Sequence, residues 1–281
     1  MANPAQTRGL LADLPRLVIL TLASLIILAP FIWMVSVSMK PQSEVFSGSL
    51  DLIPSEFAIA ENYGKVFDRV PVATYLLNGV IVCFGILIFQ ILFAVPAAYA
   101  LAKLRFAGRE VLFGFVVLGL LVPYQTTALP LYLGFAQAGL LDSYTALIAP
   151  FTCSVFAIFL FRQFFRALPD DLINAARIDG MGEFSIVWRV VLPNAWPAAT
   201  AFAIFSVVAH WNDLFWPLIV IQTGDLYTPA MGILAFRSVE AGEDYGALMA
   251  AALLVTAPLV IAFLFAQRRF IEGITMTGLK G

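Results

Sequence analysis

Charged side chains are scarce in this sequence, and so are the residues that most often build catalytic or metal sites. Only 12% of its 281 residues are Asp, Glu, Lys or Arg, whereas 61% are hydrophobic. An average soluble domain carries about twice this fraction of charged residues. There are only two cysteines and one histidine. The excess of apolar side chains indicates a protein whose surface faces lipid, so the bilayer is its first expected partner.

The same scarcity excludes several classes of function. No G-x-x-x-x-G-K-[ST] phosphate loop is present, so the chain has no such site for hydrolysing ATP itself. Cys83 and Cys153 lie in apolar stretches and belong to no cluster with metal-ligand spacing. One histidine without a nucleophile motif argues against covalent catalysis, and a net charge of −2 gives no basic field for nucleic acid. We therefore expect no catalytic residue, metal, cofactor or nucleic-acid partner.

Long uncharged stretches indicate how often the chain crosses the membrane. Six of them can each hold one spanning helix of about 20 residues, and none can hold two helices and a turn. The sequence thus predicts an all-α, multi-pass membrane protein with six transmembrane helices at about 16–39, 73–101, 111–133, 144–161, 197–220 and 247–266. The remaining segments are an N-terminal tail, an external segment, a polar loop and a C-terminal tail, at 1–15, 40–72, 165–197 and 268–281.

The distribution of basic residues predicts the orientation, because cytoplasmic loops carry an excess of Lys and Arg. With the N-terminus inside, four bases lie outside: Lys40, Lys65, Arg69 and Arg237. The other twelve lie in the cytoplasm: Arg8, Arg16, Lys103, Arg105, Arg109, Arg162, Arg166, Arg177, Arg189, Arg268, Arg269 and Lys280. Both termini and the polar loop are therefore expected on the cytoplasmic side.

Some polar residues fall at membrane depth, where they should face protein instead of lipid. For Asn78 and Gln90 in the second helix, hydrogen bonding between helices is favoured over contact with a substrate. Prolines interrupt the third helix, which is tolerated where the freed backbone groups are buried or line a cavity. Gln125 and Thr126 beside them belong either to a kinked packing helix or to a translocation path.

The fifth helix carries the sequence HWNDLFWPL around one deep acid, Asp213. A buried carboxylate costs several kcal/mol unless it is paired, protonated or wetted. Asp213 and Asn212 are candidates for accepting hydrogen bonds from a substrate's hydroxyls, with Trp211 or Trp216 offering a ring face. The alternative, slightly favoured, is a self-satisfied polar cluster that fixes this helix in the bundle.

The longest polar interruption, 165–197, contains two short helical patterns separated by a turn. Pro169 and two aspartates suit the start of the first helix, and Gly180 suits a left-handed cap at its end. The second pattern closes at Pro193. The first helix is expected to expose Ala175 and Ala176 on one face, where a partner can approach closely.

This stretch resembles the EAA loop of ABC-importer permeases, in the subfamily that imports carbohydrates. The match comprises Ala175, Ala176, Asp179, Gly180, Leu192 and Pro193. Asn174 stands where the family usually carries Glu, which removes one possible charge-assisted hydrogen bond to the ATPase. The sequences FIWMVSVSMKP, WND, WPL and RRFIEGITMTGLKG also resemble this subfamily.

The resemblance implies a type I ABC-importer permease fold in the plasma (inner) membrane, with a permease core over 73–267. It implies that 165–197 holds a coupling helix, with Asn174 and the six matching residues contacting a dimer of ATP-binding subunits at the cytoplasmic face. A second homologous permease and an external substrate-binding protein, facing the 222–246 loop, are the other implied partners.

The implied function is transport, not catalysis. The cargo would be a carbohydrate: a sugar, an oligosaccharide, a polyol or a glycerophosphate. Two alternatives stay open at this point. One is an ion-coupled secondary transporter that uses Asp213, and the other is a membrane-embedded enzyme, for which the sequence shows no catalytic constellation.

Overall fold

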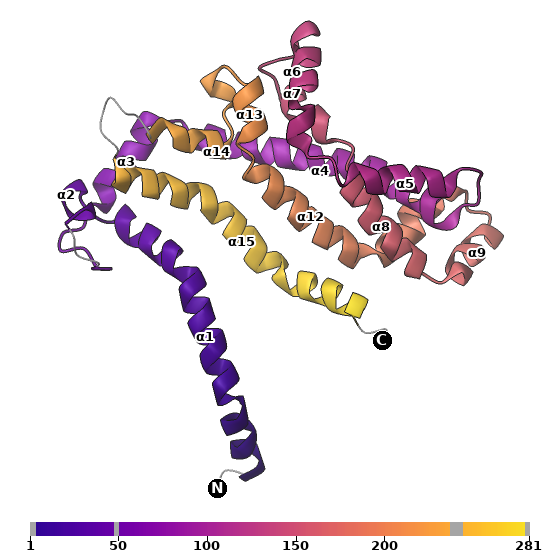
Figure 1. Cartoon of the computed structure of the whole chain (residues 1–281), viewed down its shortest axis with the longest axis horizontal. Coiled ribbons are helices and arrows are strands. Elements are labelled where there is room, and N and C mark those ends of the chain that lie inside the picture. The colour runs from indigo at the N-terminus through magenta and orange to yellow at the C-terminus, as the bar shows by residue number, and fades with distance from the viewer. Residues whose placement is uncertain (1–3, 48–50, 237–243, 279–281) are drawn as a thin grey trace. The chain divides into compact units, whose positions relative to one another are not determined.

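The computed structural model describes residues 4–47, 51–236 and 244–278, with side chains over 15–47, 51–234, 236, 244–265 and 267. Every regular element in these ranges is a helix, which confirms the predicted all-α class (Figure 1). The longer helices are α1 (Pro4–Ser38), α3 (Ile59–Arg69), α4 (Val72–Lys103), α5 (Arg109–Gly119), α6 (Ala128–Gln137), α8 (Val155–Ala167), α9 (Asp170–Ile178), α12 (Trp196–Trp211) and α15 (Tyr245–Gly278).

Short helices connect the longer ones. The α-helical ones are α2 (Gln42–Val45), α7 (Tyr144–Ile148), α10 (Glu183–Ile186), α11 (Leu192–Asn194), α13 (Phe215–Val220) and α14 (Pro229–Gly232). The 3₁₀ turns are η1 (Tyr124–Thr127), η2 (Ala149–Phe151), η4 (Gly224–Leu226) and η5 (Ile233–Phe236), and η3 (Val187–Val191) is a π-helix. Because α1 begins at Pro4, it includes most of the expected N-terminal tail. The side chains of the expected tail 268–281 and of Arg237 lie outside the described residues.

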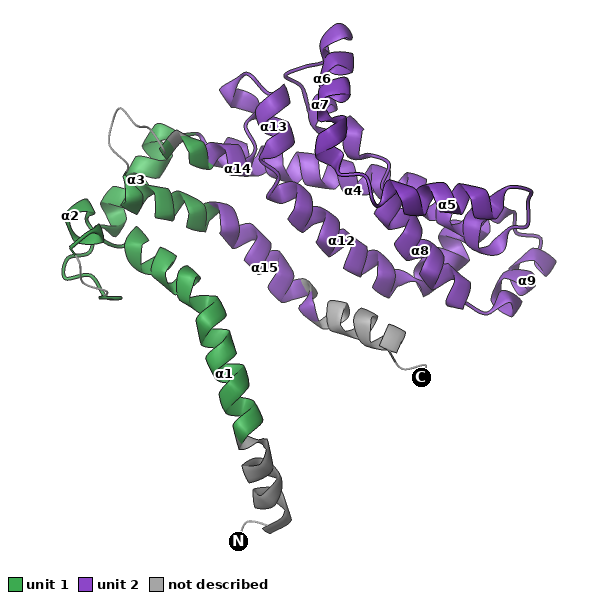
Figure 2. Cartoon of the chain, in the orientation of Figure 1, with its two compact units in different colours: residues 1–70, 233–254 green, residues 71–232, 255–281 purple. Residues whose placement is uncertain are grey.

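The chain divides into two compact units, residues 1–70 with 233–254 and residues 71–232 with 255–281 (Figure 2). In the first unit, buried Asn62 of α3 donates from Nδ2 to the carbonyl oxygens of Ser38 and Lys40, at 2.9 and 2.8 Å. These bonds satisfy carbonyls that the end of α1 leaves unpaired. Lys65 on the same helix pairs with Asp244 at 3.1 Å.

The second unit is built around α4, against which α8 and α12 pack. Alanines are buried where the three helices meet: Ala94 and Ala98 on α4, Ala157 on α8 and Ala198 on α12. Small side chains let helix backbones approach closely, and the resulting van der Waals packing is one of the forces that hold helices together inside a membrane. The buried rings of this core fill the space beside the alanines.

The polar residues of α4 are buried and bond to other segments, as predicted. Asn78 donates from Nδ2 to the carbonyl oxygen of Tyr227 at 2.9 Å. Gln90 donates from Nε2 to the carbonyl oxygen of Phe151 at 2.9 Å, and its Oε1 accepts from Ser206 Oγ at 2.6 Å. These bonds connect α4 to other segments, which is the favoured role of both residues. Gln90 also lines a cavity beside them, so its side chain has a second neighbour besides the helices.

Among the described residues, three helices are long and apolar enough to cross a bilayer, and the number rises to six if each bent pair is one span. The single helices are Pro15–Ser38, Val72–Lys103 and Tyr245–Phe265. The bent pairs are Arg109–Gly119 with Tyr124–Gln137 (93°), Tyr144–Phe151 with Val155–Ala167 (42°) and Glu183–Asn194 with Trp196–Trp211 (83°).

The expected third, fourth and fifth helices are therefore each interrupted. In the third, Pro123 adopts an extended conformation with ψ of 128°, which ends the helical path before η1. In the fourth, Ser154 is extended and its hydroxyl accepts from the N–H of Ala157, so a new helix starts there. The fifth stops at Trp211 and resumes as α13, beyond Asp213.

Candidate functional site

The expected coupling segment consists of α9, a turn, and then α10, η3 and α11 in succession. Gly180 has a φ of 81°, which confirms the predicted left-handed cap. The N–H of Met181 donates to the carbonyl of Ala176, and that of Gly180 to the carbonyl of Arg177, both at 3.0 Å. This pair of bonds is a complete Schellman motif, which fixes the direction in which the chain leaves α9.

Only one of the two alanines on α9 is exposed. Ala176 is 6% exposed and packs with Ile173 into the core beneath the helix, whereas Ala175 faces outward. Residues three apart share a helix face, so Ala176 follows Ile173 inward while Ala175 lies on the neighbouring face. The expectation that both alanines face a partner is therefore wrong for Ala176.

Four large apolar side chains are exposed in the segment 165–197, namely Leu172, Ile178, Phe184 and Trp196, and two of them are exposed most. Ile178 at the end of α9 is 86% exposed, and Phe184 in α10 is 69% exposed. The polar residues Asn174, Arg177 and Asp179, near them in the sequence, are exposed as well, and the ring of Phe184 lies 6.1 Å from that of Trp188. An exposed apolar pair with a polar rim is the composition of a protein-docking surface.

The second half of the segment packs inward. Val187 and Val191 in η3 are buried, and Leu192 packs against the edge of the same core. Pro193 lies in the first turn of α11 and does not close the helix as expected, because helical structure continues to Asn194 before the 83° bend into α12. The family-matching pair Leu192 and Pro193 therefore marks the approach to this bend.

Ion pairs fix the position of α9. Lys103, at the end of α4, lies 2.6 Å from Asp170 and donates to the carbonyl of Leu168 at the same distance. The Lys103 ammonium lowers the pKa of the Asp170 carboxyl. At the other end of α9, Glu183 raises the pKa of the Arg177 guanidinium. Both shifts mean that the charged forms are stabilised by the folded arrangement.

A cavity of about 540 Å³ lies where the interrupted helices break. Its wall includes Tyr124 and Thr127 from η1 and Phe151 from η2. Ala209 and His210 of α12 line it too, as do Asn212 and Asp213 just beyond that helix. Among the described residues that line it, Asp213 is the only one with a charged side chain, and Lys and Arg do not occur. The rest of the wall is neutral and includes the rings of Tyr124, Phe151, Phe156 and Trp216.

Asp213 both lines this cavity and caps α13. Its Oδ1 accepts from the backbone N–H groups of Phe215 and Trp216, at 3.0 and 3.4 Å, and from the hydroxyl of Tyr124 at 3.3 Å. The structure therefore contains the self-satisfied cluster that the sequence suggested. The same carboxylate is nevertheless on the cavity wall, so the two roles are compatible.

The structure brings together some of the substrate-path candidates and not others. Asn212 and Asp213 line the cavity, whereas Gln125, Thr126 and Trp211 do not. Trp211 is buried, and its indole N–H donates to the carbonyl of Val255 at 3.0 Å, which is a packing role. Thr126 bonds to its own turn, from Oγ1 to the carbonyl of Pro123 at 2.7 Å.

Sequence reasoning missed several lining residues for identifiable reasons. In a 3₁₀ turn the side chains at i and i+3 are eclipsed, so Tyr124 and Thr127 share the inward face in place of Gln125 and Thr126. Phe151 and Cys153 lie in the break between α7 and α8, where no periodicity marks an inward face. The only available signal there was Ser154, a helix-capping residue followed by an apolar run.

Comparison with known proteins identifies relatives along most of the chain. Residues 90–275 match the family described as "Binding-protein-dependent transport system inner membrane component". The arabinooligosaccharides transport system permease protein AraQ of Halalkalibacterium halodurans is 34% identical, over 90% of this chain and 91% of its own. The sn-glycerol-3-phosphate transport system permease protein UgpE of Yersinia pestis is 32% identical, over 92% and 94%. Both are transport permeases and not enzymes.

The fold is also that of a solved permease. A chain in the crystal structure of a bacterial ABC transporter involved in the import of the acidic polysaccharide alginate superposes with a TM-score of 0.81. The alignment covers 96% of this chain and 99% of that one, at 23% sequence identity. This similarity establishes the predicted ABC-importer permease architecture.

Proposed function

Since the chain belongs to the family of binding-protein-dependent transport system inner membrane components, we propose that it is a permease subunit of an ATP-driven carbohydrate importer and forms half of the translocation pathway. The single observation that carries this proposal is the matched family together with relatives named as transport permeases. Because no phosphate loop is present, ATP hydrolysis belongs to a separate subunit dimer.

The coupling segment is where that dimer would act. Ile178 and Phe184 present apolar side chains to a partner, and the Schellman motif at Gly180 holds them at a fixed angle. The salt bridge between Lys103 and Asp170 connects the segment to α4. Closure of the ATP-binding subunits would move α9 as a rigid body, and α4 would move with it. Such motion converts nucleotide binding into alternating access to the cavity.

The cavity supports a neutral cargo over an anionic one. Aromatic rings offer flat apolar faces, and Asn212 and Asp213 offer oxygen acceptors for hydroxyl groups. An anionic cargo would meet the carboxylate of Asp213 with no base on the described wall to offset the repulsion. A sugar, oligosaccharide or polyol is therefore proposed, and a glycerophosphate is disfavoured.

The surroundings of the subunit follow from the same function. We place it in the plasma (inner) membrane with both termini in the cytoplasm, as the Lys/Arg distribution indicates. A second homologous permease would complete the pathway, and an external substrate-binding protein would deliver the cargo. The side chains of 15–32 on α1 are exposed or nearly so, and this apolar surface suits lipid or the second permease.

The test is copurification of the ATP-binding subunit with tagged full-length chain. Wild type and Ile53→Asp should retain it, because Ile53 is 77% exposed in the expected external segment. Ile178→Asp should lose it, since the charge would be placed in the docking surface. Equal recovery from both variants would remove the coupling assignment. Uptake by reconstituted chain without an ATPase, driven by an ion gradient, would favour the secondary-transporter alternative.

A further inference from the structure

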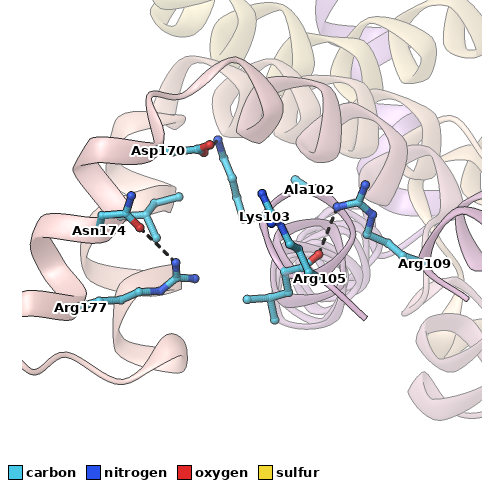
Figure 3. Close-up of a pocket in the computed structure, with 9 residues that line it drawn as sticks. Ala102, Lys103, Arg105, Arg109, Asp170, Asn174 and Arg177 are labelled. Carbon is cyan, nitrogen blue, oxygen red and sulfur yellow. Dashed lines mark hydrogen bonds and ion pairs between the residues drawn. The ribbon is translucent and has the colours of Figure 1, made fainter. Parts of the chain in front are cut away.

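A basic pocket lies between the end of α4 and the face of α9. It has a volume of about 610 Å³, and four bases line it: Lys103, Arg105, Arg109 and Arg177. Figure 3 shows Asp170, Asn174 and Arg177 of α9 on one side, facing Lys103, Arg105 and Arg109 on the other. The side chain of Lys103 is only 7% exposed, so this ammonium is held in the wall of the pocket.

The bases of this pocket are not fully neutralised. Three of them each have one acidic partner within 2.6 to 2.8 Å: Lys103 with Asp170, Arg109 with Glu110 and Arg177 with Glu183. Buried Arg162 shares Glu110, at 3.4 Å. Arg105 is exposed and forms no salt bridge and no hydrogen bond with another described residue. The pocket therefore retains positive charge, and Arg105 is the group best placed to offer it to a ligand.

An apolar groove begins next to this pocket. It is lined by Ala97 and Ala100 of α4, by Phe106 of the connecting loop and by Leu112 and Phe115 of α5, with a volume of about 440 Å³. A third hollow shares Arg105 and Arg109 with the basic pocket and Phe106 with the groove, so the three lie around the same loop. Charge and apolar surface thus follow one another along the same short loop.

We propose that the pocket and groove together bind one anionic phospholipid from the leaflet beside the coupling segment. The phosphate would lie against Arg105, with Lys103 and Arg109 in the surrounding wall, and an acyl chain would occupy the groove. Cytoplasmic leaflets are anionic, and basic pockets at helix ends on that side are suited to their head groups. The groove favours a lipid over a free phosphate as the ligand, because only a lipid has an acyl chain that the apolar walls can bury.

The basic pocket shares no lining residue with the cavity proposed for the cargo, and the groove shares only Val155 with it. The existence of the lipid site does not depend on what is imported. It touches α9, however, so a bound lipid would connect the bilayer directly to the segment proposed to move with the ATPase. The lipid proposal uses the expected membrane orientation of the chain only to say which leaflet supplies the lipid. Failure of the lipid proposal would therefore leave ATPase copurification and uptake unchanged.

The experiment is native mass spectrometry of the full chain, purified in detergent with the subunits that accompany it. Palmitoyl-oleoyl phosphatidylglycerol or the matching phosphatidylcholine is added at equal concentration. Wild type should retain phosphatidylglycerol preferentially, and Arg105→Gln should weaken its binding about fivefold, as expected for one base near a lipid phosphate. Arg189→Gln removes a base that is exposed outside the pocket and should bind as wild type does. Phe106→Ser should also weaken binding, because it removes one wall of the groove.

Three results would overturn the proposal. One is equal retention of the two lipids by wild type. Another is an equal effect of the substitutions at 105 and 189, which would mean that only total charge matters. The last is displacement of phosphatidylglycerol by inorganic phosphate at the concentration of the lipid, which would identify a site for a free anion.

Discussion

The guanidinium of Arg177 binds the carboxylate of Glu183 with two hydrogen bonds, from Nε to Oε1 at 2.7 Å and from Nη2 to Oε2 at 3.2 Å. The hydroxyl of Tyr99 donates to the same Oε2 at 2.5 Å. One carboxylate thus connects α9, α10 and α4. A third arm of Arg177 donates to Oδ1 of Asn174 at 3.3 Å. Asn174, which departs from the family pattern, is therefore part of this network, together with Glu183 at the start of α10.

This arrangement predicts that a carboxylate at 174 substitutes for the one at 183. Glu183→Gln should destabilise the coupling segment by about 1 kcal/mol, since the pair is partly exposed to solvent. Asn174→Glu alone should be tolerated, with the ATPase still bound. In the double variant, the new carboxylate should accept from Arg177 and recover much of the loss. ATPase retention by the four chains in a double-mutant cycle measures this coupling.

A control variant tests whether the effect is specific to the acids that pair with Arg177. Asp171→Asn changes an acid of α9 that has no salt bridge among the described residues and is not one of the family-matching positions, so it should leave ATPase retention as in wild type. Strictly additive effects of the substitutions at 174 and 183 would show that the two positions do not share Arg177.

Gly180 provides a second prediction, because its φ of 81° is unfavourable for any residue with a Cβ. Gly180→Ala should destabilise the segment by about 1–2 kcal/mol, although no atom lies within 4 Å of the added methyl group. Gly182→Ala is the matched control, since Gly182 has a φ of −72° and equally open space. Limited proteolysis between α9 and α10 should accelerate in the first variant alone. Equal cleavage of both variants would show that the Schellman geometry does not hold the turn.

Local signals made the coupling segment predictable. Each of these signals affects the backbone only within a few residues of its own position. They are Gly180, the aspartates after Pro169 and the break between two helical runs, and all of them are present in the structure. The inward turn of Ala176 was not predictable in the same way, because adjacent positions on a helix differ by only about 100°. Which of two neighbouring alanines is buried depends on Ile173 and the core beneath it.

The cavity illustrates what sequence patterns leave out. The prolines located the interruption in the third helix. The sequence also singled out the deep acid Asp213, but it predicted a continuous fifth helix, which in the structure stops at Trp211. It did not place Phe151 or Cys153 on the same wall as Asp213, because that requires three breaks far apart in the chain to meet. The 3₁₀ turn at Tyr124–Thr127 then shifted the inward face by one residue.

Cys153 allows the cavity to be tested without mutation of its polar groups. It is exposed and lines the cavity, whereas Cys83 is 1% exposed. A bulky maleimide should therefore modify Cys153 alone and abolish ATP-driven uptake by filling the path. Cys153→Ser, which keeps a small polar side chain, should transport normally and resist the reagent. Full activity of alkylated wild type, with modification confirmed by mass, would place the path elsewhere.

Asp213 combines a structural and a transport role, and two substitutions separate them. Asp213→Asn retains an Oδ1 acceptor for the N–H groups of Phe215 and Trp216, so the start of α13 should stay folded and the complex should assemble. It removes the charge from the cavity wall, and a hydrogen bond to a neutral acceptor is weaker than one to a carboxylate by about 1 kcal/mol. Uptake should therefore fall about fivefold or more. Asp213→Ala should also lower the thermal stability of the complex, because both N–H groups lose their acceptor. If Asp213→Asn transports as wild type does while Asp213→Ala is unstable, the carboxylate serves only to cap α13.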